Sequence, residues 1–330
     1  MSLSGKTVLV TGATGFLGGH LVRRLSAEGA QVRALARRPG RDRYIKDLPQ
    51  VTVVMGDITN RSSLDPHLHG VDVVFHVAAA LGGPLALQRD VNKAGTVNVM
   101  QAAANAGVAR VVHVSTVAVY GYRNRSDVTE ATPLDPGADP YHITKVEAEG
   151  VVREIGATHA LDYSIVRPAM IYGPRSGAWT RTMFNVAKRG IWLGDGSGST
   201  FPVYVDDVVD LCLTVADHPA AVGEAFNCAP DPSPTWREFL GTYQALIGRD
   251  RWIGVPIPLL KLVVPLVAML APKHSQLKDL PDLLGLVTSG ITYKMDKARD
   301  VLGWTASVDL QQGIDRCVPY LREKGLLPNA

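Results

Sequence analysis

Short apolar runs alternate with helix-length segments through the first half of the chain. The runs are rich in β-branched residues and end in turn residues, which is typical of strands buried on both faces of a parallel sheet. Strands are expected at residues 6–11, 31–36, 51–55, 71–77, 110–115 and 163–167. Helices are expected at residues 15–28, 90–106 and 139–155. This alternation predicts an α/β fold with a doubly wound parallel sheet and right-handed crossovers.

The alternation weakens after residue 168. Residues 174–200 are rich in glycine and polar side chains around one amphipathic piece at 180–189, whereas residues 203–217 and 225–228 resume the strand and helix pattern. From residue 230 the chain is rich in proline, with scattered helical patterns. We therefore expect a Rossmann nucleotide-binding domain at 1–172, to which 203–229 return. A smaller C-terminal substrate domain is expected at 173–330, formed mainly by 173–202 and 230–330.

The longest apolar stretch covers residues 252–272. It contains Lys261 and the prolines Pro256, Pro258, Pro265 and Pro272. A helix that spans a bilayer needs roughly 20 mostly apolar residues without such interruptions. No transmembrane segment is therefore expected, and the stretch is interpreted as a buried helix, a lid over an apolar pocket or a contact with a membrane surface.

Composition narrows the function classes. The 330 residues are 46% apolar, which allows a large core and argues against disorder. The net charge of +3 is too small to indicate a nucleic-acid partner, and no aromatic residue interrupts the basic loop at 37–43. Cys212, Cys228 and Cys317 form neither a disulfide framework nor a metal-ligand spacing. No metal, no signal peptide and a cytoplasmic location are therefore expected.

A glycine-rich turn at residues 11–18 follows the first predicted strand and begins the first predicted helix. In this setting the first glycine permits the tight turn, the second lets the backbone approach a pyrophosphate, and the third lets helix and sheet pack closely. The anion would lie at the helix N-terminus, where free N–H groups and the helix dipole favour it. Contacts with a dinucleotide are expected from Gly12, Thr14, Gly15, Phe16, Leu17 and Gly18.

The end of the second predicted strand bears on which dinucleotide binds. Sites for NAD usually place an acid there for the ribose 2′-hydroxyl, but this chain has Arg37 and Arg38. A guanidinium can pair with a 2′-phosphate, and one such bond is worth roughly 1.5–3 kcal/mol. NADP(H) is therefore expected in preference to NAD(H). Further cofactor contacts are expected at the ends of the next two strands, from Asp57, Ile58, Ala78, Ala79 and Ala80.

Candidate catalytic residues follow in the next helix. Tyr141 and Lys145 lie one helical turn apart, so both project from the same face. A phenol has a pKa near 10, so acid–base work near pH 7 requires a shift of about three units. The lysine ammonium and an oxidised nicotinamide both favour the phenolate. With Thr116 orienting the substrate oxygen, the pattern predicts hydride transfer at a carbinol carbon while Tyr141 moves the hydroxyl proton.

Together these motifs resemble the extended short-chain dehydrogenase/reductases, which include sugar-nucleotide epimerases, dihydroflavonol reductases and 3β-hydroxysteroid dehydrogenases. The likeness covers nearly the whole chain, through further motifs at 90–96, 114–121, 167–174, 204–208 and 298–304. It places the catalytic hydroxyl at Thr116, with Ser115 as the alternative. It also implies cofactor contacts at Asn92 and Pro168, and a homodimer through the helices near 92–106 and 139–155.

Departures from the sugar-nucleotide members indicate the branch. Met170 stands where those members carry an asparagine, and Thr200 where they carry an arginine that pairs with the diphosphate. Val117 and Ala118 follow the catalytic threonine, where the sugar dehydratases carry Asp-Glu. The leading hypothesis is therefore an NADP-dependent oxidoreductase that interconverts an alcohol and a ketone or aldehyde on a bulky apolar, steroid-like or aromatic, substrate. A sugar-nucleotide epimerase and a non-catalytic NADP sensor are the alternatives.

Overall fold

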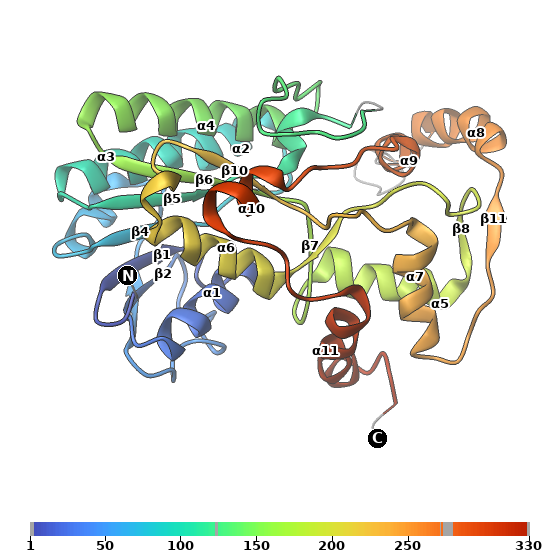
Figure 1. Ribbon diagram of the computed structural model, residues 1–330, viewed down its shortest axis with the longest axis horizontal. Helices are drawn as coiled ribbons and strands as arrows, with labels where there is room; N and C mark the ends of the chain where they lie inside the picture. The colour runs from blue at the N-terminus through green and yellow to red at the C-terminus, as the bar shows by residue number, and fades with distance from the viewer. Residues whose placement is uncertain (1–2, 123–124, 271, 273–279, 329–330) are drawn as a thin grey trace.

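The computed structural model describes residues 3–122, 125–270, 272 and 280–328. At its centre lies a parallel sheet of seven strands in the order β10-β6-β5-β4-β1-β2-β3 (Figure 1). The strands are β1 (Thr7–Thr11), β2 (Gln31–Ala36), β3 (Val51–Met55), β4 (Val73–His76), β5 (Arg110–Val114), β6 (Asp162–Pro168) and β10 (Ala225–Cys228). The winding direction reverses between β1 and β4. The structure therefore confirms the predicted doubly wound Rossmann fold.

Each face of the sheet is covered by helices, and the side chains of one strand divide between two apolar cores. Val8 and Val10 pack in a core with α1 (Phe16–Ala27) and α6 (Val205–Asp217). Leu9 points the other way, into a core with α3 (Gly95–Asn105) and α4 (Pro140–His159). Successive side chains of a strand alternate between faces, so burial on both faces requires the nearly continuous apolar runs seen in the sequence.

Strands β2, β3 and β10 have the predicted bounds, whereas two helices differ from the prediction. The predicted helix at 90–106 begins earlier, as α2 (Leu85–Gln88), and continues through the π-helical residues Arg89–Ala94 into α3. The predicted helix at 139–155 continues as α4 to His159. Gly156 lies inside the helix and packs against the Tyr163 ring, where an added Cβ would collide.

Apart from α10, which lies beside β10, the smaller elements lie to the right of the central sheet in Figure 1. β7 (Met170–Tyr172) pairs with β9 (Pro202–Tyr204), and β8 (Ile191–Leu193) pairs with β11 (Ile253–Val255). The helices here are α5 (Met183–Arg189), α7 (Trp236–Ala245), α8 (Ile257–Leu270), α9 (Leu280–Thr288), α10 (Asp296–Leu302) and α11 (Leu310–Glu323). Whether residues 173–202 and 230–330 fold as a separate substrate domain stays a prediction.

The apolar stretch at 252–272 forms β11 and α8, except that Ala271 lies outside the described residues. The buried-helix interpretation is wrong: only Val264 and Ala268 of α8 are buried, whereas Leu262 is 68% exposed. Within the part of the chain that the structure describes, no helix is both long and apolar enough to cross a membrane.

Candidate active site

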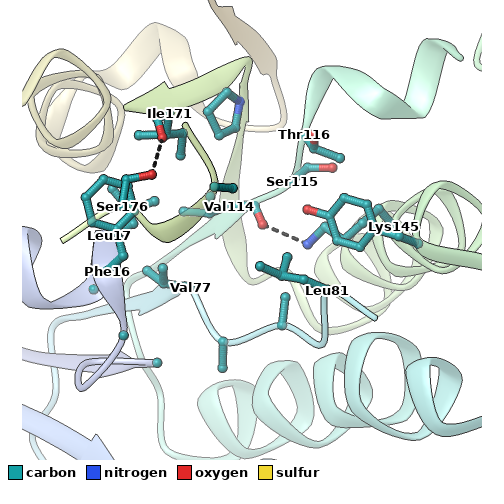
Figure 2. Close-up of a pocket in the computed structure, with 18 of the residues that line it drawn as sticks. Phe16, Leu17, Val77, Leu81, Val114, Ser115, Thr116, Lys145, Ile171 and Ser176 are labelled. Carbon is teal, nitrogen blue, oxygen red and sulfur yellow. Dashed lines mark hydrogen bonds between the residues drawn. The ribbon is translucent and has the colours of Figure 1, made fainter. Parts of the chain in front are cut away.

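A cavity of about 720 Å³ lies at the carboxyl ends of the central strands. It spans the point between β1 and β4 where the winding of the sheet reverses. In open α/β sheets this crevice is the usual place for a ligand, because loops from both halves of the sheet diverge there. Figure 2 shows residues from several of these loops, including Phe16, Val77 and Thr116, around the same space.

Most of the residues expected from the sequence line this cavity. They are Gly12, Thr14, Gly15, Phe16, Leu17, Gly18, Arg37, Asp57, Ile58, Ala78, Ala79, Thr116, Tyr141, Lys145 and Pro168. Arg38, Ala80 and Asn92 do not line it. The structure thus brings together segments that are far apart in the sequence, and it separates Arg37 from its neighbour Arg38.

The glycine turn has a shape that fits a pyrophosphate. Gly12 has a φ of 68°, and an added Cβ there would lie 2.8 Å from the backbone nitrogen of Ala78. A Cβ on Gly18 would collide with the carbonyl oxygen of Gly12, so α1 packs directly against the turn. Gly15 is the N-cap of α1 and offers no side-chain cap. The amide groups of the first helical turn are therefore suited to bind an anion.

The far end of the cavity carries a cation where many dinucleotide sites carry an acid. Arg37 follows β2, is exposed and lines the cavity. Asp57 follows β3, and its Oδ1 accepts hydrogen bonds from the backbone N–H and the hydroxyl of Thr59 at 3.0 and 2.9 Å. The carboxylate of Asp57 is therefore engaged in its own loop, while the guanidinium of Arg37 extends beside the cavity.

Asn92 supports the wall of the cavity from behind. It is buried, its Oδ1 accepts from the N–H of Ala80 at 2.7 Å, and its Nδ2 donates to the carbonyl oxygen of Ala80 at 3.0 Å. The same Nδ2 donates to the Thr144 hydroxyl at 3.0 Å. Asn92 thereby ties the loop after β4 to α4, at the residue just before Lys145. Its expected contact with the cofactor stays a prediction.

Tyr141 is positioned by the start of α4. The N-cap Asp139 accepts from the N–H groups of Tyr141 and His142 at 2.8 and 3.0 Å, which fixes the first turn. Burial raises the pKa of Tyr141 to about 12, although a hydrogen bond with the Thr116 hydroxyl acts to lower it. The lower phenol pKa that the sequence led us to expect requires an oxidised nicotinamide as well as Lys145, and it stays a prediction.

Lys145 lies one turn after Tyr141 and is only 2% exposed. Its Nζ donates to the carbonyl oxygen of Val114 at 2.8 Å, the bond drawn in Figure 2, and lies 3.4 Å from Nε2 of His113. Burial lowers the pKa of Lys145 to about 8, while the charge of Glu149 acts to raise it. The amine therefore changes charge close to physiological pH.

Two buried histidines lie behind Lys145, one in β4 and one in β5. The rings of His76 and His113 are 5.2 Å apart, and His76 lies 2.8 Å from the Thr11 hydroxyl and 3.0 Å from the Thr96 hydroxyl. Burial, assisted by the charge of Lys145, lowers the pKa of His76 to about 3 and that of His113 well below its usual value. Both rings are therefore neutral at pH 7. Sequence reasoning missed them, although histidines within apolar strands were the available signal.

Ser115, the alternative to Thr116, lines the same cavity. Its hydroxyl is buried and makes no hydrogen bond within the described residues. The Thr116 hydroxyl accepts from the N–H of Ala118 at 3.2 Å, and its interaction with the phenol of Tyr141 acts to lower the pKa of that phenol. This interaction favours Thr116 as the group that acts with Tyr141, and Ser115 offers a second hydroxyl beside it.

The remaining wall of the cavity is apolar and was largely missed from the sequence. It is formed by Tyr122, Met170, Ile171, Trp179 and Phe201. The pairing of β7 with β9 brings these separate segments together, with Met170 opposite Pro202 in the register. Met170 is 3% exposed, and the buried Thr200 hydroxyl donates to its sulfur at 3.9 Å. Positions 170 and 200, which the sequence marked as departures, are therefore in contact.

Comparison with known proteins agrees with this geometry. Residues 8–229 match the sequence model of the NAD-dependent epimerase/dehydratase family. A UDP-glucose 4-epimerase of Mycolicibacterium smegmatis is 31% identical, over 96% of this chain and 98% of its own. A 3β-hydroxysteroid dehydrogenase/Δ5→4-isomerase of Mycobacterium tuberculosis is 28% identical, over 95% and 90% of the two chains.

Among solved structures, DesIV, a dTDP-glucose 4,6-dehydratase from Streptomyces venezuelae with NAD and TYD bound, is similar with a TM-score of 0.76. It is 27% identical, and the match covers 98% of this chain and 99% of DesIV. Steroid dehydrogenases and sugar-nucleotide enzymes are thus both among the relatives. The chain belongs to the NAD-dependent epimerase/dehydratase family, within the extended short-chain dehydrogenase/reductase superfamily of oxidoreductases.

Proposed function

We propose that the protein is an NADP-dependent oxidoreductase that interconverts an alcohol and a ketone or aldehyde on a bulky apolar, steroid-like or aromatic, substrate. The contact between Met170 and Thr200 carries the proposal. At these positions the sugar-nucleotide enzymes that the chain resembles hold the diphosphate with an amide and a guanidinium. Here an incoming diphosphate would lose water and meet a thioether, which is unfavourable.

The shape and chemistry of the substrate end support an apolar ligand. Tyr122 and Phe201 stack with ring centroids 6.2 Å apart, and Trp179 and Ile171 continue the same wall. Pockets for apolar ligands are lined in this way, with a few polar groups that set orientation. Thr116 and Tyr141 supply such groups in the same cavity. Similarity to a protein named as a 3β-hydroxysteroid dehydrogenase is consistent with this assignment.

The cofactor is proposed to lie along the glycine turn, with its pyrophosphate at the N-terminus of α1 and its 2′-phosphate beside Arg37. A charged hydrogen bond from Arg37 would favour NADPH over NADH by about 10- to 150-fold. The small side chains of Ala78 and Ala79 line the path between these sites and Lys145. When bound, the dinucleotide supplies or accepts the hydride.

The proton is proposed to move through Tyr141. With a pKa of about 12 the phenol is protonated at pH 7, so in the direction of reduction it donates its proton to the substrate oxygen. Thr116, which hydrogen-bonds Tyr141, orients the same oxygen. Lys145, one helical turn after Tyr141, is held by the Val114 carbonyl and is proposed to stabilise the phenolate that remains. The ketone gains one hydride and one proton, and the alcohol results.

Two properties of the whole molecule remain proposals. A homodimer would form through α3 and α4, as in the family that the sequence resembles. A cytoplasmic location is supported by the free, buried thiols of Cys212, Cys228 and Cys317, which suit a reducing compartment. Sedimentation velocity of the purified protein tests the first proposal, and a monomer at micromolar concentration would refute it.

The alternative is a sugar-nucleotide epimerase, which the 31% identity to the Mycolicibacterium enzyme favours. The two functions differ in how they use the nicotinamide. An epimerase regenerates its cofactor in each cycle, whereas an alcohol dehydrogenase consumes it. Thermal shifts with NADPH and NADH, followed by assays with apolar ketones and UDP-sugars, separate them. We expect greater stabilisation by NADPH and NADPH oxidation with ketones; UDP-sugar interconversion without added cofactor would overturn the proposal.

A further inference from the structure

Helix α8 has two apolar faces. Val264 and Ala268 are buried against the rest of the protein. On the outer face, large apolar side chains are at least 41% exposed; they are Leu259, Leu262, Val263, Leu266, Met269 and Leu270. Their spacing of three and four residues places them on a single stripe along the helix. An apolar stripe of this length exposed to solvent marks an interaction surface.

The exposed apolar side chains continue from α8 onto the neighbouring strand pair. β11 leads into α8, and Ile253 of β11 lies opposite Ile191 of β8 in the strand register. Both isoleucines are more than half exposed. Figure 1 shows α8, β11 and β8 together at the end of the molecule farthest from the nucleotide-binding sheet. We call Ile191, Ile253 and the exposed stripe of α8 the outer apolar surface.

The outer apolar surface is separate from the active-site cavity. None of its residues lines the cavity, and the same holds for every described residue of the stretch at 252–272. The lid interpretation made from the sequence is therefore wrong for the described residues. Of the three interpretations of this stretch, the one that is left is a contact with a membrane surface.

The charges around this surface indicate which partner it fits. Among the described residues 251–270 there are two cations, Arg251 and Lys261, and no aspartate or glutamate; Asp250 immediately precedes them. A symmetric dimer through this surface would bring in further cations of the same kind and no acidic side chain of the surface to pair with them. Anionic lipid headgroups would instead pair with them, while the acyl region receives the apolar side chains.

The length of α8 decides how it would meet a bilayer. It has 14 residues, so it is about 21 Å long, shorter than the roughly 30 Å of a hydrocarbon core. Its buried face also remains packed on the protein through Val264 and Ala268. Both facts exclude a spanning arrangement for α8 and leave one in which the helix lies in the plane of the interface.

We propose that the outer apolar surface binds the surface of an anionic lipid bilayer. α8 lies parallel to the membrane, with Leu262, Leu266 and Met269 in the boundary between headgroups and acyl chains. Lys261, the charged residue of α8, reaches the headgroup phosphates. This docking surface does not depend on the proposed reaction, because it uses none of the residues of the cavity.

Vesicle flotation of the full chain tests the proposal. The vesicles contain phosphatidylcholine with or without an equal amount of phosphatidylglycerol. The wild-type protein should float with the anionic vesicles. A smaller fraction should float with vesicles of phosphatidylcholine alone, or with anionic vesicles at high salt. The double variant Leu262→Glu with Leu266→Glu should partition at least tenfold more weakly. Lys261→Glu should weaken binding severalfold at low salt and less at high salt.

The matched control is Val222→Glu with Val301→Glu, which adds the same charge at apolar residues that are 38% and 39% exposed elsewhere. This control should float like the wild type, and both double variants should melt within a few degrees of it. The proposal is overturned if the wild type stays in the aqueous fraction, or if the Leu262/Leu266 variant floats as well as the control. A third result would also overturn it: neither the wild type nor the Leu262/Leu266 variant floats, and the variant sediments more slowly than the wild type. The surface would then join two copies of the chain.

Discussion

The hydroxyl of Thr200 lies 3.9 Å from the sulfur of Met170, and both side chains are buried. The contact joins β7 to the segment just before β9, which together form part of the substrate end of the cavity. Because the two residues contact each other, the hydroxyl does not project alone into the cavity, and Met170 gives the wall an apolar surface. The proposal of an apolar substrate in place of a sugar diphosphate therefore rests mainly on this contact.

Met170→Asn should impair binding of the apolar substrate. A buried amide without well-placed partners costs about 1–3 kcal/mol, and it also attracts water into the apolar wall. The KM for an apolar ketone should rise at least about tenfold, whereas the Kd for NADPH should change less than about threefold. Met170→Leu, which keeps the wall apolar, is the control and should leave the KM nearly unchanged. Equal KM values for the two variants would contradict the assignment of this wall.

Tyr141→Phe should remove the proton donor and leave the cofactor site intact. A general acid contributes typically 10²–10⁴-fold, so kcat should fall by about that factor while the Kd for NADPH stays the same. Tyr122→Phe is the control, because Tyr122 lines the same cavity in the apolar wall. Its turnover should stay within about tenfold of the wild type. A Tyr141→Phe enzyme with wild-type turnover would show that another group moves the proton.

Arg37→Ala should weaken the binding of NADPH more than the binding of NADH. Loss of one charge-assisted bond to the 2′-phosphate predicts a rise of about 10- to 150-fold in the Kd for NADPH, with the Kd for NADH nearly constant. Arg38→Ala removes an equal charge from a residue that does not line the cavity, so its effect should be much smaller. Fluorescence titration measures the Kd of each variant for NADPH and for NADH. Equal effects of the two substitutions would mean that only the general charge of the loop matters.

Lys145 should make the free energy of unfolding of the protein increase with pH above pH 8. Burial lowers its pKa from 10.5 to about 8, so between these values the unfolded chain binds more protons than the folded one. Stability from this residue therefore rises with pH above pH 8. Tyr141 opposes it only above pH 10, since its pKa is raised from 10.0 to about 12. The useful window is pH 8 to 10.

Urea unfolding of the wild type and Lys145→Met checks this prediction. The free energy of unfolding of the wild type, minus that of the variant, should increase by on the order of 2 kcal/mol from pH 8 to pH 10. Below pH 8 the difference should be constant, because the full cost of burying the ammonium is then present. Parallel curves from pH 7 to pH 10 would show that the amine of Lys145 is not held in the buried position described here.

Local patterns were sufficient to predict the sheet and many of the residues that line the cavity. β2, β3 and β10 were predicted with the correct bounds because β-branched apolar runs between turns are local signals. The glycine turn and the Tyr141/Lys145 pair are local in the same sense. The end of α4 was not predictable, because Gly156 normally suggests a helix end and here serves a contact with the ring of Tyr163.

What the sequence did not reveal depends on contacts between distant segments. Trp179 and Phe201 meet in the cavity only through the pairing of β7 and β9. Arg38 was expected beside Arg37, but neighbouring residues point in different directions and only Arg37 reaches the wall. A buried helix was one of three interpretations of the apolar stretch at 252–272, and it failed because the helix has one side packed on the protein and the other exposed.

Transfer of a labelled hydride tests the central claim most directly. The protein is incubated with an apolar ketone and NADPH deuterated at C4, in separate reactions with the 4R and 4S label, and the product alcohol is analysed by mass spectrometry. The account predicts one deuterium on the carbinol carbon from one of the two labels, and loss of the signal in Tyr141→Phe. No labelled alcohol from any apolar ketone, together with interconversion of a UDP-sugar and no net NADPH oxidation, would contradict it.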